Sequence, residues 1–128
     1  MSNNTYTRRI ELPTGGYVNS TYSSENNRLM FEEFFWNNNT SQTAEYVNKN
    51  GIVYKIEKIF YENRSLSEFS EFIGDTRVGL HKKYYNNGNL EFVKSYNNLG
   101  QLHGISKSYH PDGTVIISTN YINGNYSR

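Results

Sequence analysis

The sequence contains no cysteine among its 128 residues, and that absence excludes several kinds of chemistry. Disulfide bridges, zinc sites built on thiolates and catalysis by a thiol all need this residue. Long apolar runs are missing as well: no stretch approaches the roughly 20 residues of a membrane-spanning helix, and residues 1–13 hold no apolar segment that could act as a signal peptide. We therefore expect a soluble, intracellular protein of the cytoplasm.

An excess of either charge is also lacking, because 13 Lys and Arg against 12 Asp and Glu leave a formal net charge of +1. So small a net charge creates no general field that would recruit nucleic acid or an anionic bilayer. We expect no nucleic-acid partner, and the composition does not favour a membrane as the main partner.

Hydrophobic residues make up 35% of the chain, below the roughly 45–50% of ordinary globular domains. Aromatic residues offset part of this deficit, with 12 Tyr, 7 Phe and 1 Trp. A tyrosine ring buries apolar surface while its hydroxyl stays in contact with water. The length and this composition predict a single folded domain, residues 1–128, and exclude a disordered tail.

The strongest feature of the sequence is an internal repeat, in which segments 79–103 and 104–128 align at one offset of 25 residues. The matched pairs are Gly79 and Gly104, Tyr84 and Tyr109, Gly88 and Gly113, Leu90 and Val115, and Tyr96 and Tyr121. Each segment has a tyrosine-containing run, a turn sequence and a second, alternating run. Because glycine adopts positive φ without steric penalty, Gly88 and Gly113 predict the turns of two β-hairpins.

The alternating runs give each predicted hairpin one more apolar face. A lone two-stranded hairpin is marginal in water, so the hairpins must stack edge to edge and share tyrosine contacts. The sequence therefore predicts an all-β, mainly antiparallel fold, a meander of stacked hairpins.

A third, degenerate unit is predicted between Tyr46 and Tyr61, with Gly51 as its turn residue. From Gly51 to Gly88 is 37 residues, 12 more than the repeat, so an insertion is expected near residues 62–78. Within it, residues 65–74 allow two interpretations. A capping-box pattern and apolar residues at helical spacing predict a short helix, whereas period-two alternation predicts a strand.

The N-terminal region, residues 1–45, is expected to be an irregular β region. Its densest run, residues 29–36 (LMFEEFFW), predicts a strand with Phe34 and Trp36 on one face. A strand that is apolar on both faces is either covered on both sides or contacts a second molecule. Phe34 and Trp36 are therefore candidate binding residues, and a two-fold homodimer through this run is one hypothesis.

The pattern of Gly, Tyr-Tyr, Asn-Asn-Gly and a later Tyr resembles the MORN-variant repeat, and the similarity covers residues 79–126. This repeat is found in antitoxin-like proteins of bacteria and in large DNA viruses, where the host cytoplasm would be the location. The resemblance implies a sheet of stacked hairpins and a non-enzymatic scaffold role in holding proteins together. It also implies two alternatives: an antitoxin-like neutraliser of a toxin encoded nearby, and an adaptor that binds a membrane surface or phosphoinositide.

A basic stripe is predicted on the repeats, since Lys107 is the 25-residue equivalent of Lys82. With Lys94 and neighbouring tyrosines, such a stripe fits an acidic protein and, less well, phosphoinositide or single-stranded nucleic acid. The alternative is that these residues bind no ligand and form a solvated outer face of the sheet. The candidate binding residues are Tyr84, Tyr85, Tyr109, Lys82, Lys83, Lys107, Phe34 and Trp36.

Catalytic and metal-binding patterns are not found in the sequence. His81, His103 and His110 lack the spacing of metal ligands, and no serine elbow, phosphate-binding loop or converging carboxylate pair is present. We expect no catalytic residues, no metal and no cofactor. The leading hypothesis is a non-enzymatic protein-binding module whose partner is another protein.

Overall fold

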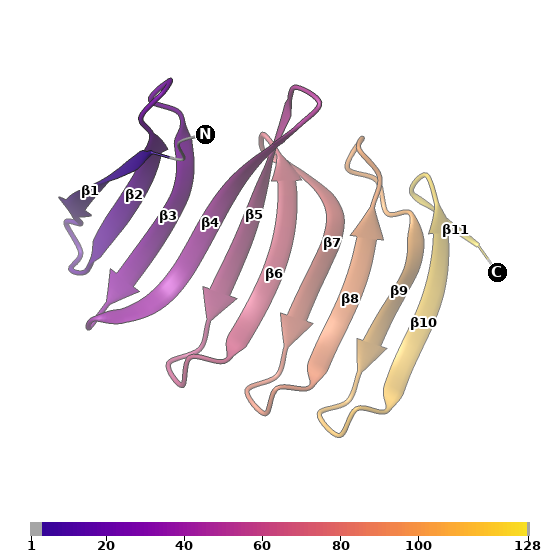
Figure 1. The fold of residues 1–128 in the computed structure, drawn as a ribbon. Coiled ribbons are helices and arrows are strands. Elements are labelled where there is room, and N and C mark those ends of the chain that lie inside the picture. Colours follow the sequence, from indigo (N-terminus) through magenta and orange to yellow (C-terminus); the bar gives the residue numbers. More distant parts are fainter. Residues whose placement is uncertain (1–3, 128) are drawn as a thin grey trace.

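The computed structural model describes residues 4–127, and in it eleven strands lie side by side in one antiparallel sheet (Figure 1). The strand order follows the chain from β1 to β11, so every connection is a hairpin between neighbours. This confirms the predicted all-β meander of stacked hairpins. The residues described form no helix, and thus none that could span a membrane.

The strands are β1 (Thr5–Glu11), β2 (Tyr17–Ser23), β3 (Leu29–Trp36), β4 (Asn39–Lys49), β5 (Ile52–Phe60), β6 (Leu66–Ile73), β7 (Thr76–Tyr84), β8 (Leu90–Tyr96), β9 (Gly104–Tyr109), β10 (Val115–Ile122) and β11 (Asn125–Ser127).

Residues 65–74 do not form the short helix that one interpretation of the sequence predicted. They contain strand β6, which pairs with β5 on one side and β7 on the other. A strand here satisfies backbone groups along both edges, whereas one short helix would leave β5 and β7 with unpaired edges. Ser65 does not cap a helix, since its backbone N–H donates to Asn63 Oδ1 (2.9 Å) in a turn. Residues 62–78, where an insertion was expected, hold this turn, β6 and the start of β7.

The repeat appears as three equivalent hairpins, β5–β6, β7–β8 and β9–β10, whose turns lie along the lower edge in Figure 1. In each turn the backbone N–H of one residue donates to the carbonyl four residues later; the pairs are Tyr61 and Ser65, Tyr85 and Asn89, and His110 and Thr114. The left-handed position is filled by Arg64 (φ 72°), Gly88 (φ 90°) and Gly113 (φ 92°). Gly51 lies instead in the β4–β5 turn, at the opposite ends of the strands.

Tyrosine hydroxyls join successive hairpins. The Tyr61 hydroxyl donates to the backbone carbonyl of Tyr84, and the Tyr85 hydroxyl donates to that of Tyr109. His110 occupies the equivalent place in β9–β10, the last of the three hairpins. Each of these bonds satisfies a carbonyl at the end of the first strand of the following hairpin, so it fixes one repeat against the next.

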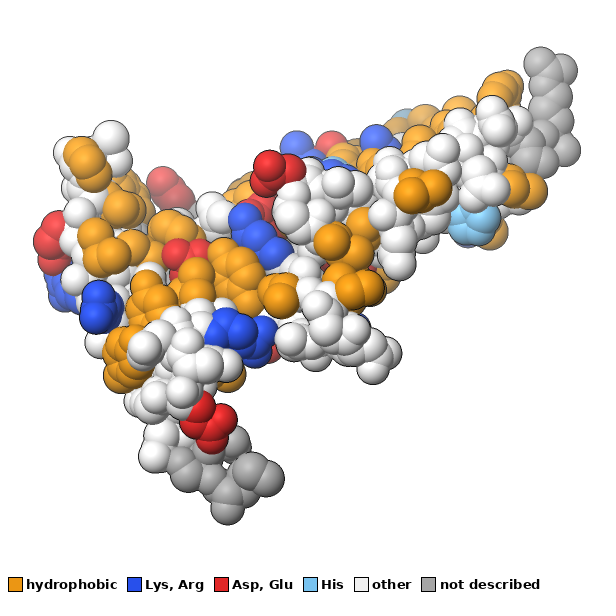
Figure 2. All heavy atoms as spheres, turned by 90° about the horizontal axis from the view of Figure 1, so that it is seen from above, with side chains coloured by type: hydrophobic (Ala, Val, Ile, Leu, Met, Phe, Trp, Pro, Cys, Tyr) orange, Lys and Arg blue, Asp and Glu red, His pale blue; other side chains and the backbone are white. Residues whose placement is uncertain are grey.

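The sheet has little enclosed core, because it is a single layer (Figure 2). Among the described residues, the buried side chains are Val18, Ala44, Val78, Ser20, Ser70 and His81. We call the side that carries His81 the His81 face. Across it Ser20, Glu32, Ala44, Glu57, Ser70, His81 and Lys94 are direct neighbours from β2 to β8. The other side, which carries Lys82, is called the Lys82 face.

His81 is the buried titratable residue of the sheet. Its Nε2 lies 2.6 Å from Glu68 Oε2, while its Nδ1 is buried without a hydrogen-bond partner among the described residues. Burial lowers the pKa of His81, against the opposing influence of Glu68; Arg77 and Lys94 lower it further. A charged imidazolium would expose neither N–H to water, so the neutral ring is favoured.

Replacing Tyr85 by Phe is expected to lower the free energy of unfolding by about 1 kcal/mol, because the carbonyl of Tyr109 loses its donor. Tyr84→Phe is the matched control, because the Tyr84 hydroxyl makes no hydrogen bond within residues 4–127. Urea denaturation of both variants measures the difference. Equal losses in the two variants would show that the hydroxyl of Tyr85 does not join the hairpins.

As the pH is lowered, the stability of the sheet is expected to fall more steeply in the wild type than in His81→Gln. The folded state has the lower His81 pKa, so the unfolded state binds more protons once the pH drops below about 6.5. This loss continues until the folded-state pKa is reached. Urea titrations at several pH values between about 7 and about 5 measure the difference, and NMR titration of the imidazole measures the pKa directly. A pKa above that of a free histidine would contradict the expectation.

Candidate binding surface

A row of alternating lysines and apolar side chains crosses five strands of the Lys82 face. Its members are Lys58, Phe69, Lys82, Val93 and Lys107, on β5 to β9 in that order. Each is the direct partner of the next in the hydrogen-bonded register. Because neighbouring strands are about 4.8 Å apart, the three lysines recur every ~9.6 Å. We call this set the lysine row.

Apolar side chains of the first strands flank the lysine row on both sides, with Glu71 and Ser95 next to them on β6 and β8. Side chains two positions apart on a strand share a face, so each lysine has an apolar neighbour before it and an aromatic one after it. The first strands of the three hairpins carry Ile56, Lys58 and Phe60; Leu80, Lys82 and Tyr84; and Ile105, Lys107 and Tyr109. Leu80 and Ile105 are 38% and 56% exposed, so apolar surface is open to solvent beside the lysines.

The ammonium groups of the lysine row have no partner of their own among the described residues. Within residues 4–127, no carboxylate lies within 4.0 Å of Lys58, Lys82 or Lys107, and none of the cation–π contacts involves them. The carboxylate of Glu71, on the same face, instead accepts a hydrogen bond from the backbone N–H of Leu80 (2.6 Å). These three positive charges are therefore available to a ligand.

The polar side chains of the His81 face, by contrast, bind one another. Tyr46 donates to Glu32 (2.7 Å), Gln42 donates to Glu57 (3.1 Å), and Lys55 forms an ion pair with Glu57 (3.3 Å). Burial, and then the hydrogen bond to Glu32, raise the pKa of Tyr46 far above its ordinary value. The carboxylates of Glu32 and Glu57 are thus bound within the sheet, whereas Lys83 and Lys94 of the same face form no ion pair among the described residues.

The basic residues expected in one stripe are divided between the two faces. Lys82 and Lys107 lie in the lysine row, as direct neighbours of Val93. Lys83 pairs in register with Glu68 and Phe92 on the His81 face, where Lys94 also lies 4.8 Å from the Phe92 ring centroid. Strand alternation places Lys82 and Lys83 on opposite sides of the sheet.

The three tyrosines expected to bind have different places. Tyr84 and Tyr109 lie on the Lys82 face beside the lysine row. Tyr85 follows the end of β7, and its hydroxyl is bound to the Tyr109 carbonyl between the hairpins.

Phe34 and Trp36, the other candidates, lie outside the lysine row, on β3. Phe34 lies on the His81 face between Val18 and Gln42. Trp36 is 51% exposed, and its ring lies against Gly15.

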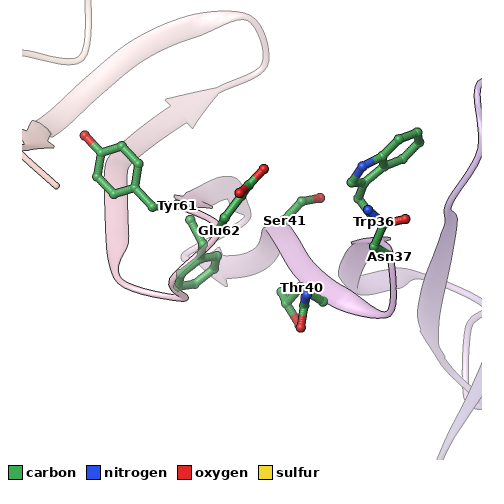
Figure 3. A pocket seen from close by; sticks show the side chains of 8 residues that line it. Trp36, Asn37, Thr40, Ser41, Tyr61 and Glu62 are labelled. Carbon is green, nitrogen blue, oxygen red and sulfur yellow. The ribbon is translucent and has the colours of Figure 1, made fainter.

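Trp36 also borders a shallow hollow of about 290 Å³, in which Trp36 and Tyr61 lie on opposite sides (Figure 3). Thr40, Ser41 and Glu62 are among its polar lining residues. Glu62 contributes the carboxylate, and no histidine lines the hollow.

The three histidines are not brought together. His81 is buried beside Glu68, whereas His103 and His110 are exposed, and His103 Nδ1 accepts from the backbone N–H of Asn123 (3.2 Å). Over the part of the chain that the structure describes, no three residues of the types His, Cys, Asp and Glu gather as metal ligands would.

Lys58 is the binding candidate that sequence reasoning missed. Its signal is the run Lys58-Ile59-Phe60, which matches Lys82-Lys83-Tyr84 at an offset of 24. That offset differs by one from the 25 of the later repeat, and Arg64 stands where the other turns have glycine. Aligning Gly51 with Gly88 therefore placed the first hairpin in the wrong register.

Comparison with known proteins agrees with the repeats seen in the sheet. Residues 77–98 and 102–123 match the family described as MORN repeat variant, and together they make up about a third of the chain. They correspond to hairpins β7–β8 and β9–β10. None of the curated proteins matches this chain.

Two solved structures of TarM resemble the fold weakly. One is a crystal structure of a point mutant of S. aureus TarM in complex with fondaparinux, α-GlcNAc-glycerol and UDP; it has a TM-score of 0.46 and 15% identity and covers 94% of this chain and 20% of that one. A second crystal structure of TarM gives a TM-score of 0.42 and 15% identity over 95% of this chain and 21% of that one. The chain spans about a fifth of the length of TarM, and the likeness carries no argument about function.

MORN repeats are generally modules that bind proteins or membranes. The matched residues, the 25-residue offset and the equivalent hairpins of the sheet agree with one another. The chain therefore carries repeats of the MORN variant, in its strands β7 to β10.

Proposed function

We propose that this chain is a non-enzymatic protein-binding module that contacts its partner through the Lys82 face. The observation that carries the proposal is the difference between the two faces of the sheet. On the His81 face, the carboxylates of Glu32, Glu57 and Glu68 are each held by a neighbouring side chain. On the Lys82 face, three lysines that have no partner among the described residues stand between apolar side chains of the same strands.

The composition of the Lys82 face fits a protein ligand. Protein interfaces combine an apolar centre, rich in aromatic residues, with charged groups that select the partner and guide its approach. Phe60, Tyr84 and Tyr109 supply aromatic surface, and the lysines supply charge of one sign. A partner with an acidic and apolar surface complements both.

Catalysis is not part of the proposal, although the His81–Glu68 pair resembles an acid–base pair. Both residues take part in the internal hydrogen bonding of an open face, and burial disfavours the charged imidazole. The hollows of about 290 and 430 Å³ are lined by residues of β3, β4 and β5 and of the β3–β4 and β5–β6 turns, not by His81 or Glu68.

A second candidate function is the adaptor at a membrane surface, favoured by the same lysines and by the exposed apolar residues Leu80 and Ile105. Lysines near an anionic bilayer are each attracted by about 1 kcal/mol, and salt weakens that attraction. The antitoxin-like role is a narrower form of protein binding and stays a hypothesis. Co-expression with the neighbouring reading frame, with growth rescue and complex formation as readouts, tests it.

Affinity capture is expected to separate the two faces. The immobilised protein is offered the native proteome, and each recovered protein is compared between Lys82→Gln and Lys83→Gln. The two variants lose the same charge from adjacent residues on opposite faces. We expect specific partners to be retained by Lys83→Gln and reduced severalfold by Lys82→Gln, because only Lys82 belongs to the lysine row.

The comparison needs folded variants, which thermal unfolding by circular dichroism checks. Equal recovery by both variants would show that the Lys82 face is not the binding surface. Recovery of nothing above an unrelated protein of equal charge, together with binding to anionic vesicles, would favour the membrane adaptor instead.

A further inference from the structure

We propose that the lysine row binds an amphipathic α-helix that lies across the strands and carries acidic residues at heptad spacing. This inference rests on the proposed function, because it names the kind of protein segment that the Lys82 face accepts. It comes from the repeat distance of the sheet, the alternation within the row and the absence of partners for its lysines within residues 4–127.

The spacing of the row matches that of a helix. Lysines two strands apart are separated by about 9.6 Å, with an apolar residue half-way, at ~4.8 Å. A helix rises 1.5 Å per residue, so residues seven apart lie on one side about 10.5 Å apart, with residues three or four apart ~4.5–6 Å along. Acidic residues at i, i+7 and i+14 therefore meet Lys58, Lys82 and Lys107. Apolar residues between them meet Phe69 and Val93.

The remaining mismatch is small. It is about 0.9 Å per step and ~2 Å over the whole row, which a four-carbon lysine stem absorbs. An extended strand fits less well, because residues three apart span nearly 10 Å but point to opposite faces. A helix is thus the regular element that presents both the charges and the apolar groups on one side at this spacing.

The sides of the row suit such a ligand. A helix is about 10 Å wide with its side chains, which is wider than one row of the sheet. Its flanks would contact the exposed Leu80 and Ile105 on one side and Tyr84 and Tyr109 on the other. Burial of apolar area supplies affinity, while the three lysines set position and direction along the sheet.

The test uses two labelled peptides of three heptads and equal composition. In one, Glu recurs every seven residues with Leu three or four positions after each; in the other, the same Glu and Leu residues are shuffled so that no heptad remains. Fluorescence anisotropy measures their dissociation constants for the full chain. We expect the heptad peptide to bind roughly tenfold more tightly, and its affinity to fall as salt rises from about 0.05 to about 0.3 M.

Two triple variants distinguish the row from general charge. The first triple variant removes all three charges of the lysine row, by Lys58→Gln, Lys82→Gln and Lys107→Gln. The second removes the same charge from the His81 face, by Lys55→Gln, Lys83→Gln and Lys94→Gln. We expect the first triple variant to bind the heptad peptide roughly tenfold more weakly, because three ion pairs of a fraction of a kcal/mol each are removed. The second should change its affinity less than about twofold. If a triple variant unfolds, the single variants Lys82→Gln and Lys83→Gln replace the two triples.

Equal affinity for both peptides, equal loss in both variants, or no binding to the wild type would each overturn the inference. If partners captured from the proteome depend on Lys82 while the heptad peptide does not bind, the proposed function stands and the helix is the wrong ligand. Sedimentation with vesicles of phosphatidylserine and phosphatidylcholine is run alongside. Vesicle binding that depends on the row, without peptide binding, would assign the row to a membrane.

Discussion

Backbone pairing between adjacent strands is the interaction on which the whole structure depends, because the described residues form no second layer over the sheet. Eleven strands pair only with their neighbours in the chain, and few side chains are fully enclosed. The usual gain from a hydrophobic core is therefore small here, and side-chain pairs across neighbouring strands supply much of the stability. Stacked rings, such as Tyr17 on Phe35 at 4.6 Å and Tyr6 on Tyr22 at 5.3 Å, are pairs of this kind. Stability of such an array is approximately a sum of hairpins and of the contacts between them.

This construction also explains why the two faces differ. A single layer must keep both faces compatible with water, and it does so in two ways. The His81 face is closed by hydrogen bonds and ion pairs among its own residues, as between Lys55 and Glu57 or Tyr46 and Glu32. On the Lys82 face, the lysines of the lysine row form no ion pair with any described residue, and apolar side chains such as Leu80 and Ile105 are open to solvent. A ligand displaces water from the second face at lower cost, because no internal ion pair has to be broken.

Much of the fold was predictable from the sequence, because glycine after Asn or Asp is typical of a turn with positive φ. Gly88 and Gly113 follow Asn or Asp in the turns, and their left-handed conformation is observed. The first hairpin was harder to recognise, since Arg64 adopts the same conformation without being glycine. Residues 65–74 were ambiguous because their apolar residues fit both periods. The pairing with β5 and β7, a property of the tertiary structure, decides in favour of a strand.

The binding surface was predictable only in part. Repeat arithmetic places Lys82 and Lys107 in line, and strand alternation separates Lys83 from them. The contribution of Phe69 and Val93 could not be found in that way, because both lie on second strands whose register depends on the bulges near each turn. These bulges each add one residue, at Ser67, Glu91 and Ile116. A shift of one residue would have placed the opposite set of side chains beside the lysines.

Because a tyrosine hydroxyl links one hairpin to the next, successive hairpins follow one another at a constant spacing along the sheet. Each added hairpin of this type would lengthen the basic row by one lysine and one apolar group, at an unchanged interval. The number of heptads in a matching ligand would then grow with the number of hairpins, so gene duplication within such a protein alters its selectivity by length instead of by new side chains. In the β9–β10 hairpin the equivalent residue is His110, which has no phenol hydroxyl, so the series of tyrosine links ends there within the described residues.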